Sequence, residues 1–155
     1  MIRFLGIDYG TKRIGLAIGD SDTGVASPLK TVIAQGEAGE QVRAVLRAAR
    51  EYDFDAFVVG LPLNMDDTEG KQAKLTRVFG DALAQAVGRP VHYCDERLSS
   101  RTARELLVPA ELSRKKAKRA ENAVAAQVML QAFLDNWAAS GVHEDPFSFE
   151  GEGQR

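Results

Sequence analysis

Two acidic residues follow apolar segments of the kind that form buried strands. Asp8 comes after residues 3–7, and Glu96 comes after Asp95 and residues 91–94. A charged side chain at such a position is costly unless it pairs with a cation or binds a metal ion. Carboxylates are the preferred ligands of hard divalent ions, and two such ions about 3.5–4 Å apart can catalyse phosphodiester cleavage. The pattern alone is equally compatible with turn acids or salt-bridge partners.

The composition narrows the chemistry that these acids can support. The single cysteine, Cys94, cannot form an internal disulfide, and with two histidines it cannot build a Cys/His zinc site, so a bound metal needs oxygen ligands. The net charge of -2 argues against nonspecific coating of nucleic acid. No apolar run is long enough to span a bilayer and no secretory signal opens the chain, so we predict a cytoplasmic protein.

The acids must be positioned by the strands and helices around them. Residues 3–8, 14–18 and 25–33 are predicted strands joined by short turns, which makes an antiparallel meander. Pro28 places the third strand at an edge, because proline cannot donate a ladder hydrogen bond. In the rest of the chain, helices alternate with strands, which favours parallel pairing. These predicted elements are a helix around 42–49, a strand at 56–59, a helix with an inward stripe at 75–86, a strand at 91–94, a helix from Ser99 or Ser100 to 107, and a last helix at about 120–137.

The predicted fold class is therefore α/β, with a five-stranded mixed sheet flanked by helices. With 155 residues, of which 45% are hydrophobic, the chain fits one domain at 1–138, followed by a flexible acidic tail at 139–155. The first strand of an open α/β sheet is usually central, and a strand two crossovers later can end beside it. On that topology, Asp8 and Glu96 meet at one edge of the sheet.

Three segments resemble the signature segments of the YqgF family, in order and at the family's spacing. They are residues 5–17 (LGIDYGTKRIGLA), 59–65 (VGLPLNM) and 95–100 (DERLSS). The resemblance covers residues 2 to about 137. It implies a ribonuclease H-like fold related to the Holliday-junction resolvases, and a nuclease that uses Mg²⁺ or Mn²⁺ to trim the 5′ end of precursor 16S ribosomal RNA.

The resemblance also implies which residues are catalytic. Asp8 and Glu96 match the first two acids of the family. Alignment on residues 130–134 places the third acidic position at Asn122, which departs from the family pattern. Asn122 could still coordinate a metal through its side-chain oxygen, and its neighbour Glu121 is the alternative ligand. Because the two side chains point about 100° apart on a helix, only one of them can face the metal.

Other polar and basic residues are candidates for contacts with nucleic acid. They lie in the turn after Asp8, at the end of the strand at 56–59, beside Glu96, and in the basic run before the last helix, which we expect to be a loop. The predicted contacts are Thr11, Lys12, Arg13, Asn64, Arg97, Ser99, Arg101, Arg114, Lys115, Lys116, Lys118 and Arg119.

Two alternatives to ribosomal RNA maturation stay open. One is a DNA endonuclease like the Holliday-junction resolvases, which act as symmetric dimers because a junction has two equivalent strands to cut. The other is a noncatalytic RNA-binding or transcription-associated module of the same fold, which the asparagine at position 122 favours. The sequence allows a monomer or a homodimer. A nucleotide-binding protein of the actin or sugar kinase type is less compatible, because those proteins close two such lobes around ATP.

Overall fold

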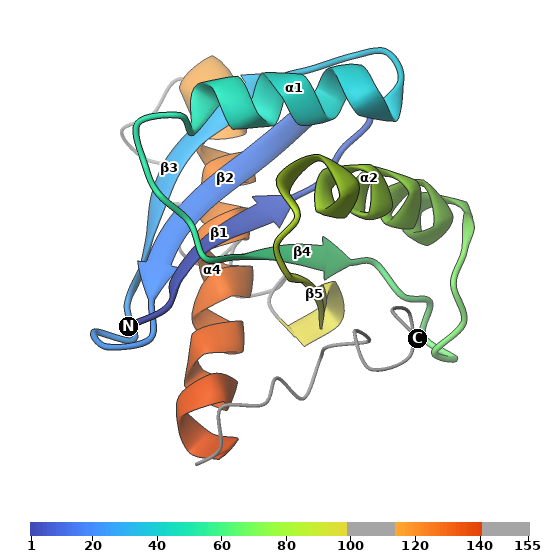
Figure 1. Ribbon diagram of the computed structural model, residues 1–155. Helices are drawn as coiled ribbons and strands as arrows, with labels where there is room; N and C mark the ends of the chain where they lie inside the picture. The colour runs from blue at the N-terminus through green and yellow to red at the C-terminus, as the bar shows by residue number, and fades with distance from the viewer. Residues whose placement is uncertain (99–113, 141–155) are drawn as a thin grey trace.

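The computed structural model describes residues 1–98 and 114–140 and contains one five-stranded mixed sheet (Figure 1). The strand order is β3-β2-β1-β4-β5. Antiparallel pairing of β1 with β2 and of β2 with β3 confirms the predicted meander, and parallel pairing joins β1 to β4 and β4 to β5. The strands are β1 (Arg3–Asp8), β2 (Arg13–Asp20), β3 (Ala26–Ile33), β4 (Ala56–Leu61) and β5 (Val91–Asp95).

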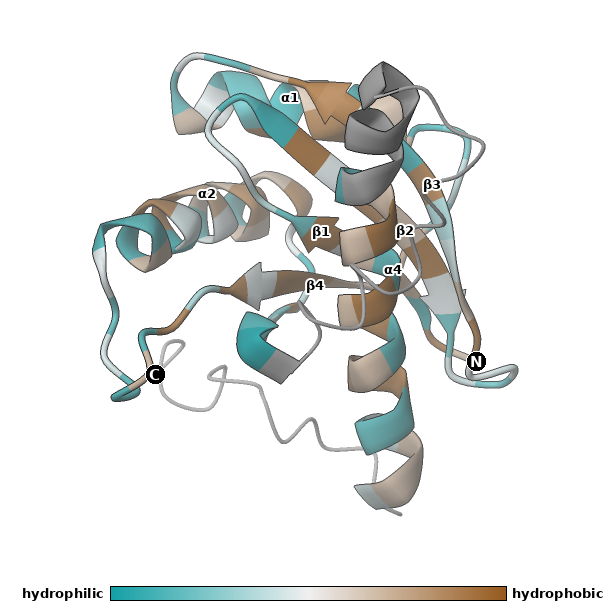
Figure 2. Ribbon diagram, turned by 180° about the vertical axis from the view of Figure 1, so that it is seen from behind, coloured by the Kyte–Doolittle hydropathy of each residue, from teal (hydrophilic) through white to brown (hydrophobic). Residues whose placement is uncertain are grey.

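Helices cover both faces of this sheet. Two of them, α1 and α2, lie on one face, and the long helix α4 crosses the other face (Figures 1 and 2). A short 3-10 turn, η1, follows β5 directly. The helical elements are α1 (Ala38–Ala48), α2 (Lys71–Val87), η1 (Glu96–Leu98) and α4 (Arg114–Ser140). None of the helices in the described ranges is both long enough and apolar enough to cross a bilayer.

The central strand β1 contributes to two separate cores. Successive side chains of a strand point to opposite faces. Leu5 and Ile7 therefore pack under α1 and α2, whereas Phe4 packs under α4. The core under α4 is aromatic, with Phe4 in edge contact with Phe133 and Trp137 and with the buried His92 beside them. His92, Cys94 and Trp137 are all buried on this side of the sheet.

Glycines let α4 lie unusually close to the sheet. A Cβ atom built on Gly6 would be 2.9 Å from the Cβ of Leu130, and one on Gly19 would be 2.9 Å from a methyl carbon of Leu134. At Gly15 the contact is with the backbone, because a Cβ there would lie 1.9 Å from the carbonyl oxygen of Asn122. The separation of α4 from β1 and β2 is thus set by the absence of side chains.

The inward face of α2 differs from the prediction. Leu75 and Val78 were expected inside but are 36% and 56% exposed. The buried face carries Phe79 and Leu83 of the predicted stripe, and its other buried positions are small or polar. The helix lies close to the sheet because Gly80 has no Cβ, which would collide with the Tyr93 hydroxyl. The buried residues are Ala73, Thr76, Phe79, Gly80 and Leu83. The helix ends as predicted at Gly88, which has a left-handed φ of 62°.

The basic run at 114–119 is helical, which corrects the prediction of a loop. It forms the first turns of α4, since Lys, Arg and Ala are good helix formers and join a helix that is already packed. The predicted helix from Ser99 or Ser100 to 107 lies outside the described residues. So does the predicted acidic tail, apart from residues 139 and 140, which end α4.

The seating of α4 predicts a large cost for a single methyl group at Gly15. Gly15→Ala should lower the free energy of unfolding by about 3 kcal/mol, the upper end of typical overpacking costs, because the Asn122 backbone cannot move without shifting the helix. The measurement is urea denaturation followed by circular dichroism. Gly39→Ala is the control. Its Cβ would be 3.6 Å from the Arg43 side chain, so it should change stability by less than about 1 kcal/mol in either direction. Equal losses in both variants would contradict this packing.

Candidate metal-binding site at the end of the central strand

Asp8 is the last residue of β1 and lies on the α4 face of the sheet. Gly6, two residues earlier, faces Leu130 of α4, and the two-residue period of a strand gives Asp8 the same face. Its neighbours across the sheet are Gly15 of β2, which is its antiparallel partner, and Gly60 of β4, which follows the Ile7–Val59 pair. Asp8 is therefore flanked by two residues without side chains.

Glu96 reaches the same region from β5, although β5 is not next to β1. The prediction that these two strands end side by side is wrong, since β4 lies between them. Strands are spaced by about 4.8 Å, so β1 and β5 are about 10 Å apart. Gly60 of β4 closes part of this gap. A Cβ built there would lie 3.7 Å from the carboxyl carbon of Glu96, so the carboxyl group lies above Gly60, the neighbour of Asp8 on β4.

Asn122 approaches from the other side of Asp8. Its backbone carbonyl lies directly above Gly15, the residue paired with Asp8. The structure thus brings the backbone of Asn122 and the carboxyl group of Glu96 onto the two positions that flank Asp8. Within the described ranges, no group of three or more Asp, Glu, His or Cys side chains is arranged to hold a metal ion. The predicted donor set consists of two carboxylates and one neutral amide.

Arg97 ties the turn that carries Glu96 to the loop after β4. Its guanidinium donates to both carboxylate oxygens of Asp95, at 2.7–3.1 Å, and to Asp67 at 2.7 Å. It also donates to the carbonyl of Asn64 at 2.9 Å. The backbone N–H of Arg97 donates to Asp95 as well, at 3.0 Å. These bonds hold the loop after β4 and the turn after β5 together. A contact between Arg97 and a nucleic acid would compete with them.

The same pair affects the ionisation of Asp95. The hydrogen bonds donated by Arg97 lower the pKa of the Asp95 carboxyl, against a smaller opposing effect of burial. Asp95 therefore stays ionised at neutral pH, with both carboxylate oxygens accepting hydrogen bonds from Arg97. The 3-10 turn at 96–98 begins directly after Asp95 and contains its partner Arg97.

The loop from Pro62 to Gly70 is closed by its own hydrogen bonds. The side-chain amide of Asn64 donates to the Thr68 hydroxyl at 3.0 Å, and its backbone N–H donates to the Thr68 carbonyl at 2.9 Å. Asp67 adopts a left-handed φ of 70° at the turn. The predicted substrate contact Asn64 therefore lies in a braced loop on the same edge of the sheet as the candidate site.

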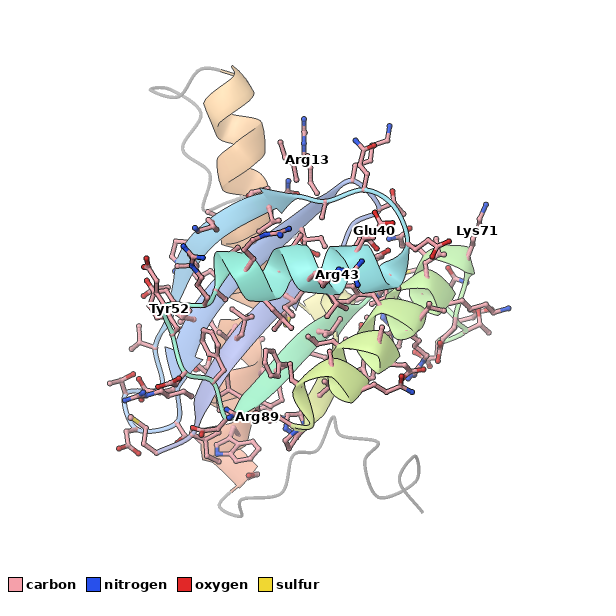
Figure 3. The ribbon with its side chains drawn as sticks, turned by 45° about the horizontal axis from the view of Figure 1, so that its top comes forward. Arg13, Glu40, Arg43, Tyr52, Lys71 and Arg89 are labelled. Carbon is pink, nitrogen blue, oxygen red and sulfur yellow. The ribbon has the colours of Figure 1, made fainter. Side chains whose placement is uncertain are left out.

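The turn between β1 and β2 presents Thr11, Lys12 and Arg13 to solvent. The turn is tight, because a Cβ on Gly10 would collide with the carbonyl of Arg13. Figure 3 shows Arg13 projecting from one edge of the molecule, with Lys71 at the start of α2 on the same side and Arg89 at the other end. Lys71 is exposed, and it was not among the predicted contacts with nucleic acid. Its position in the first turn of α2 was the available indication.

Gln41 is a second residue that the sequence analysis missed. It lies in α1 with 2% of its surface exposed and bonds to the turn after Asp8. A glutamine beside the inward-facing Val42 and Val45 was the available indication. Other predicted contacts are not placed: Ser99 and Arg101 lie outside the described residues. For five basic residues and Glu121 the structure gives only the helical backbone of α4. These five are Arg114, Lys115, Lys116, Lys118 and Arg119.

Comparison with known proteins gives a family for this arrangement. The RuvX family model, described as Holliday junction resolvase, matches residues 2–136. The chain belongs to the RuvX family. RuvX is the family named YqgF in the sequence analysis, so the predicted membership is confirmed.

Curated relatives of this RuvX-family protein match along most of their length. A protein of Anaeromyxobacter dehalogenans (strain 2CP-C), named "Putative pre-16S rRNA nuclease", is 44% identical over 137 residues, which cover 88% of this chain and 99% of the relative. A protein of Moorella thermoacetica with the same name is 38% identical over 141 residues, covering 91% of this chain and 100% of the relative. The chain therefore spans the whole of these relatives.

A solved structure with the same fold is RuvC of Thermus thermophilus in complex with a Holliday junction substrate. The TM-score is 0.57 at 14% identity, and the match covers 90% of this chain and 98% of RuvC. A second Thermus thermophilus RuvC structure gives a TM-score of 0.53 at 18% identity, covering 90% of this chain and 97% of the other. At such identities the likeness shows the fold alone, and it confirms the predicted ribonuclease H-like fold of this RuvX-family protein.

The Asp95–Arg97 pair should make stability dependent on pH. Because the pKa of Asp95 is lowered in the folded state, its contribution is present above the ordinary value of 3.8 and is lost as the pH falls through the folded-state pKa. Asp95→Asn should therefore cost about 1 kcal/mol at pH 7, a discounted value because the pair is partly exposed. The difference from wild type should shrink below about pH 4 in thermal or urea denaturation. The exposed Asp53→Asn is the control, and it should be neutral at pH 7. A gap for Asp95→Asn that does not change with pH would contradict this assignment.

Proposed function

We propose that this RuvX-family protein is a divalent-metal-dependent nuclease that matures the 5′ end of precursor 16S ribosomal RNA. Family membership and the names of the curated relatives support a nuclease. The observation that carries the proposal for the site is the position of the Glu96 carboxyl group above Gly60, the residue of β4 next to Asp8. Glu96 directly follows β5, and Gly60 puts no side chain of β4 between it and the central strand.

The donor chemistry of this region fits Mg²⁺ or Mn²⁺. Asp8 and Glu96 would hold the ion through carboxylate oxygens, and Asn122 would complete the set through its amide oxygen, with Glu121 as the alternative. A bound divalent ion supplies an activated water and a counter-charge for the leaving oxygen. Asn122 brings no charge, so the two carboxylates must balance the cation, and we expect weaker metal binding than a third acid would give.

The surroundings favour a phosphate backbone as the ligand. Lys12 and Arg13 project beside Asp8, and α1 and α2 both begin at this edge of the sheet, where helix N-termini favour anions. The residues of α4 before Asn122 extend past this edge by about 12 Å, at 1.5 Å per residue, and they include the basic run at 114–119. We propose that these cations hold the strand on both sides of the scissile bond.

Two other functions of the same fold remain as candidates. The RuvX description and the fold shared with RuvC favour a DNA endonuclease that cuts Holliday junctions. Such an enzyme should act as a homodimer, whereas trimming of ribosomal RNA needs no symmetry. The neutral Asn122 favours a noncatalytic RNA-binding module. These candidates differ in what they cleave and in whether they cleave at all.

Removal of either carboxylate should abolish cleavage while binding persists. Asp8→Asn and Glu96→Gln should each lower Mn²⁺-dependent cleavage of precursor 16S RNA by more than about 100-fold, since loss of an outer-shell partner alone typically costs 10–100-fold. Affinity for the RNA should change less than about threefold, because most of it comes from phosphate contacts. Gel assays of cleavage and filter binding give the two numbers.

Asp53→Asn, at the opposite end of the sheet, is the matched charge control and should retain full activity. Precursor RNA, single strands and four-way DNA junctions are compared with Mg²⁺ and with Mn²⁺. Cleavage of junctions alone would support the resolvase, and binding without any cleavage would support the noncatalytic module. Wild-type cleavage by Asp8→Asn would exclude the proposed site.

A substitution at the neutral position 122 should strengthen metal binding, whereas the substitutions of Asp8 and Glu96 weaken it. Asn122→Asp adds a third negative charge and should lower the Mn²⁺ concentration for half-maximal cleavage by about tenfold, equivalent to about 1.4 kcal/mol of metal binding. Calorimetric titration with Mn²⁺ tests the same change without substrate. Asn122→Ala should shift both values the other way. If neither substitution alters metal affinity, Asn122 is not a ligand and Glu121→Gln becomes the variant to measure.

A further inference from the structure

Gln41 makes a set of contacts that its place in a helix does not require. Its side-chain amide nitrogen donates to the carbonyl oxygens of Ala34 at 3.1 Å and Thr11 at 3.2 Å, with a longer contact of 3.5 Å to Gly10. Its amide oxygen accepts a hydrogen bond from the Tyr9 hydroxyl at 2.8 Å. The side chain is 2% exposed, so these groups supply the hydrogen-bond partners that its buried amide needs.

These contacts fix the orientation of two successive peptide groups. The described chain has no cis peptide bonds, and in a trans peptide the C=O and N–H groups point in opposite directions. When Gln41 draws the carbonyls of Gly10 and Thr11 inward, the N–H groups of Thr11 and Lys12 turn outward. Two successive N–H groups with this orientation can donate together to one anion.

The surroundings prevent this turn from relaxing into another shape. The Tyr9 ring packs on Phe79 of α2, with ring centroids 4.8 Å apart, so the hydroxyl that orients Gln41 is itself held. On the other side of the turn, the N–H of Ala34 donates to the carbonyl of Lys12 at 3.0 Å. The turn is therefore held by α1, by α2 and by the segment that follows β3.

We propose that Gln41 is a positioning residue that holds the Thr11 and Lys12 N–H groups outward to bind a phosphate of the nucleic acid next to Asp8. The inference rests on the proposed nuclease function, because it is that function which brings a phosphate to this edge. Gln41 does not touch the substrate. It acts from the opposite face of the sheet, through carbonyl oxygens, on N–H groups that lie on the site side of the same peptide planes.

The test uses Gln41→Met, which keeps the length and helix preference of the side chain but removes its donors and its acceptor. In an Asp8→Asn background, which prevents cleavage, a 12-nucleotide single-stranded RNA should shift the ¹⁵N–¹H resonances of Thr11 and Lys12. Gln41→Met in that background should weaken binding about tenfold, as expected for loss of one charge-assisted hydrogen bond. The slope of log affinity against log salt concentration should stay unchanged, because a backbone N–H group is neutral and the cations that displace counterions are kept.

Thr76→Val is the matched control. Thr76 is a fully buried polar residue of α2 whose hydroxyl donates to the carbonyl of Gln72 in its own helix, so its loss should leave both affinity and salt slope unchanged. In the active protein, which keeps Asp8, Gln41→Met should raise KM about tenfold and change kcat less than about threefold. The reason is that the lost contact is made equally in the bound substrate and in the transition state. A merely destabilised protein would bind the RNA more weakly without losing the RNA-induced shifts of the Thr11 and Lys12 resonances.

The outcomes separate this inference from the proposed function. If the wild-type protein cleaves RNA and Gln41→Met keeps the wild-type affinity, the role of Gln41 is wrong and the nuclease proposal stands. The same holds if RNA binds without moving the Thr11 and Lys12 resonances. If the wild-type protein neither binds nor cleaves RNA or DNA, the proposed function fails and this inference fails with it.

Discussion

The close seating of one helix on a row of glycines is the constraint on which the rest of the structure depends. Where α4 crosses β1 and β2, the sheet offers Gly6, Gly15 and Gly19, and helix atoms occupy the space that Cβ atoms would fill. At Gly60 of β4 the fit is looser, because a Cβ there would make ordinary contacts with Met129 of α4 and with the side chain of Glu96. Asp8 is the side chain that stands between Gly15 and Gly60, so the arrangement of the site follows from backbone packing.

Much of the fold could be predicted from the sequence because its signals are local. An apolar run marked β1, two-residue alternation marked β2, Pro28 marked an edge strand, and Gly88 marked the end of α2, and all of these are confirmed. The family resemblance supplied what the local patterns could not, namely which acids belong together. Residue types and spacing alone left Asp8 and Glu96 as possible turn acids, because a single sequence carries no direct signal of which strand ends are neighbours in space.

What could not be predicted depends on contacts between segments that are distant in the chain. The order of the parallel strands placed β4 between the two acids, and only the structure shows that Gly60 offsets this separation. Arg97 looked like a substrate contact, but its bonds to Asp95 and Asp67 could not be inferred from a motif. The basic run before Asn122 was assigned to a loop because charge density dominated the pattern, although its residues favour helix and continue a packed one.

The continuity of α4 links two properties that are separate in many enzymes. One unbroken helix begins with the basic run and then passes Asn122 above Gly15 before it enters the aromatic core. Any pull on its leading turns by a polyanion acts on the same rigid rod that sets the height of residue 122 over the sheet. If the basic run binds a polyanion and Asn122 binds the metal ion, as we propose, capture of the substrate and alignment of the reacting groups are mechanically coupled, so a substitution that alters one also alters the other.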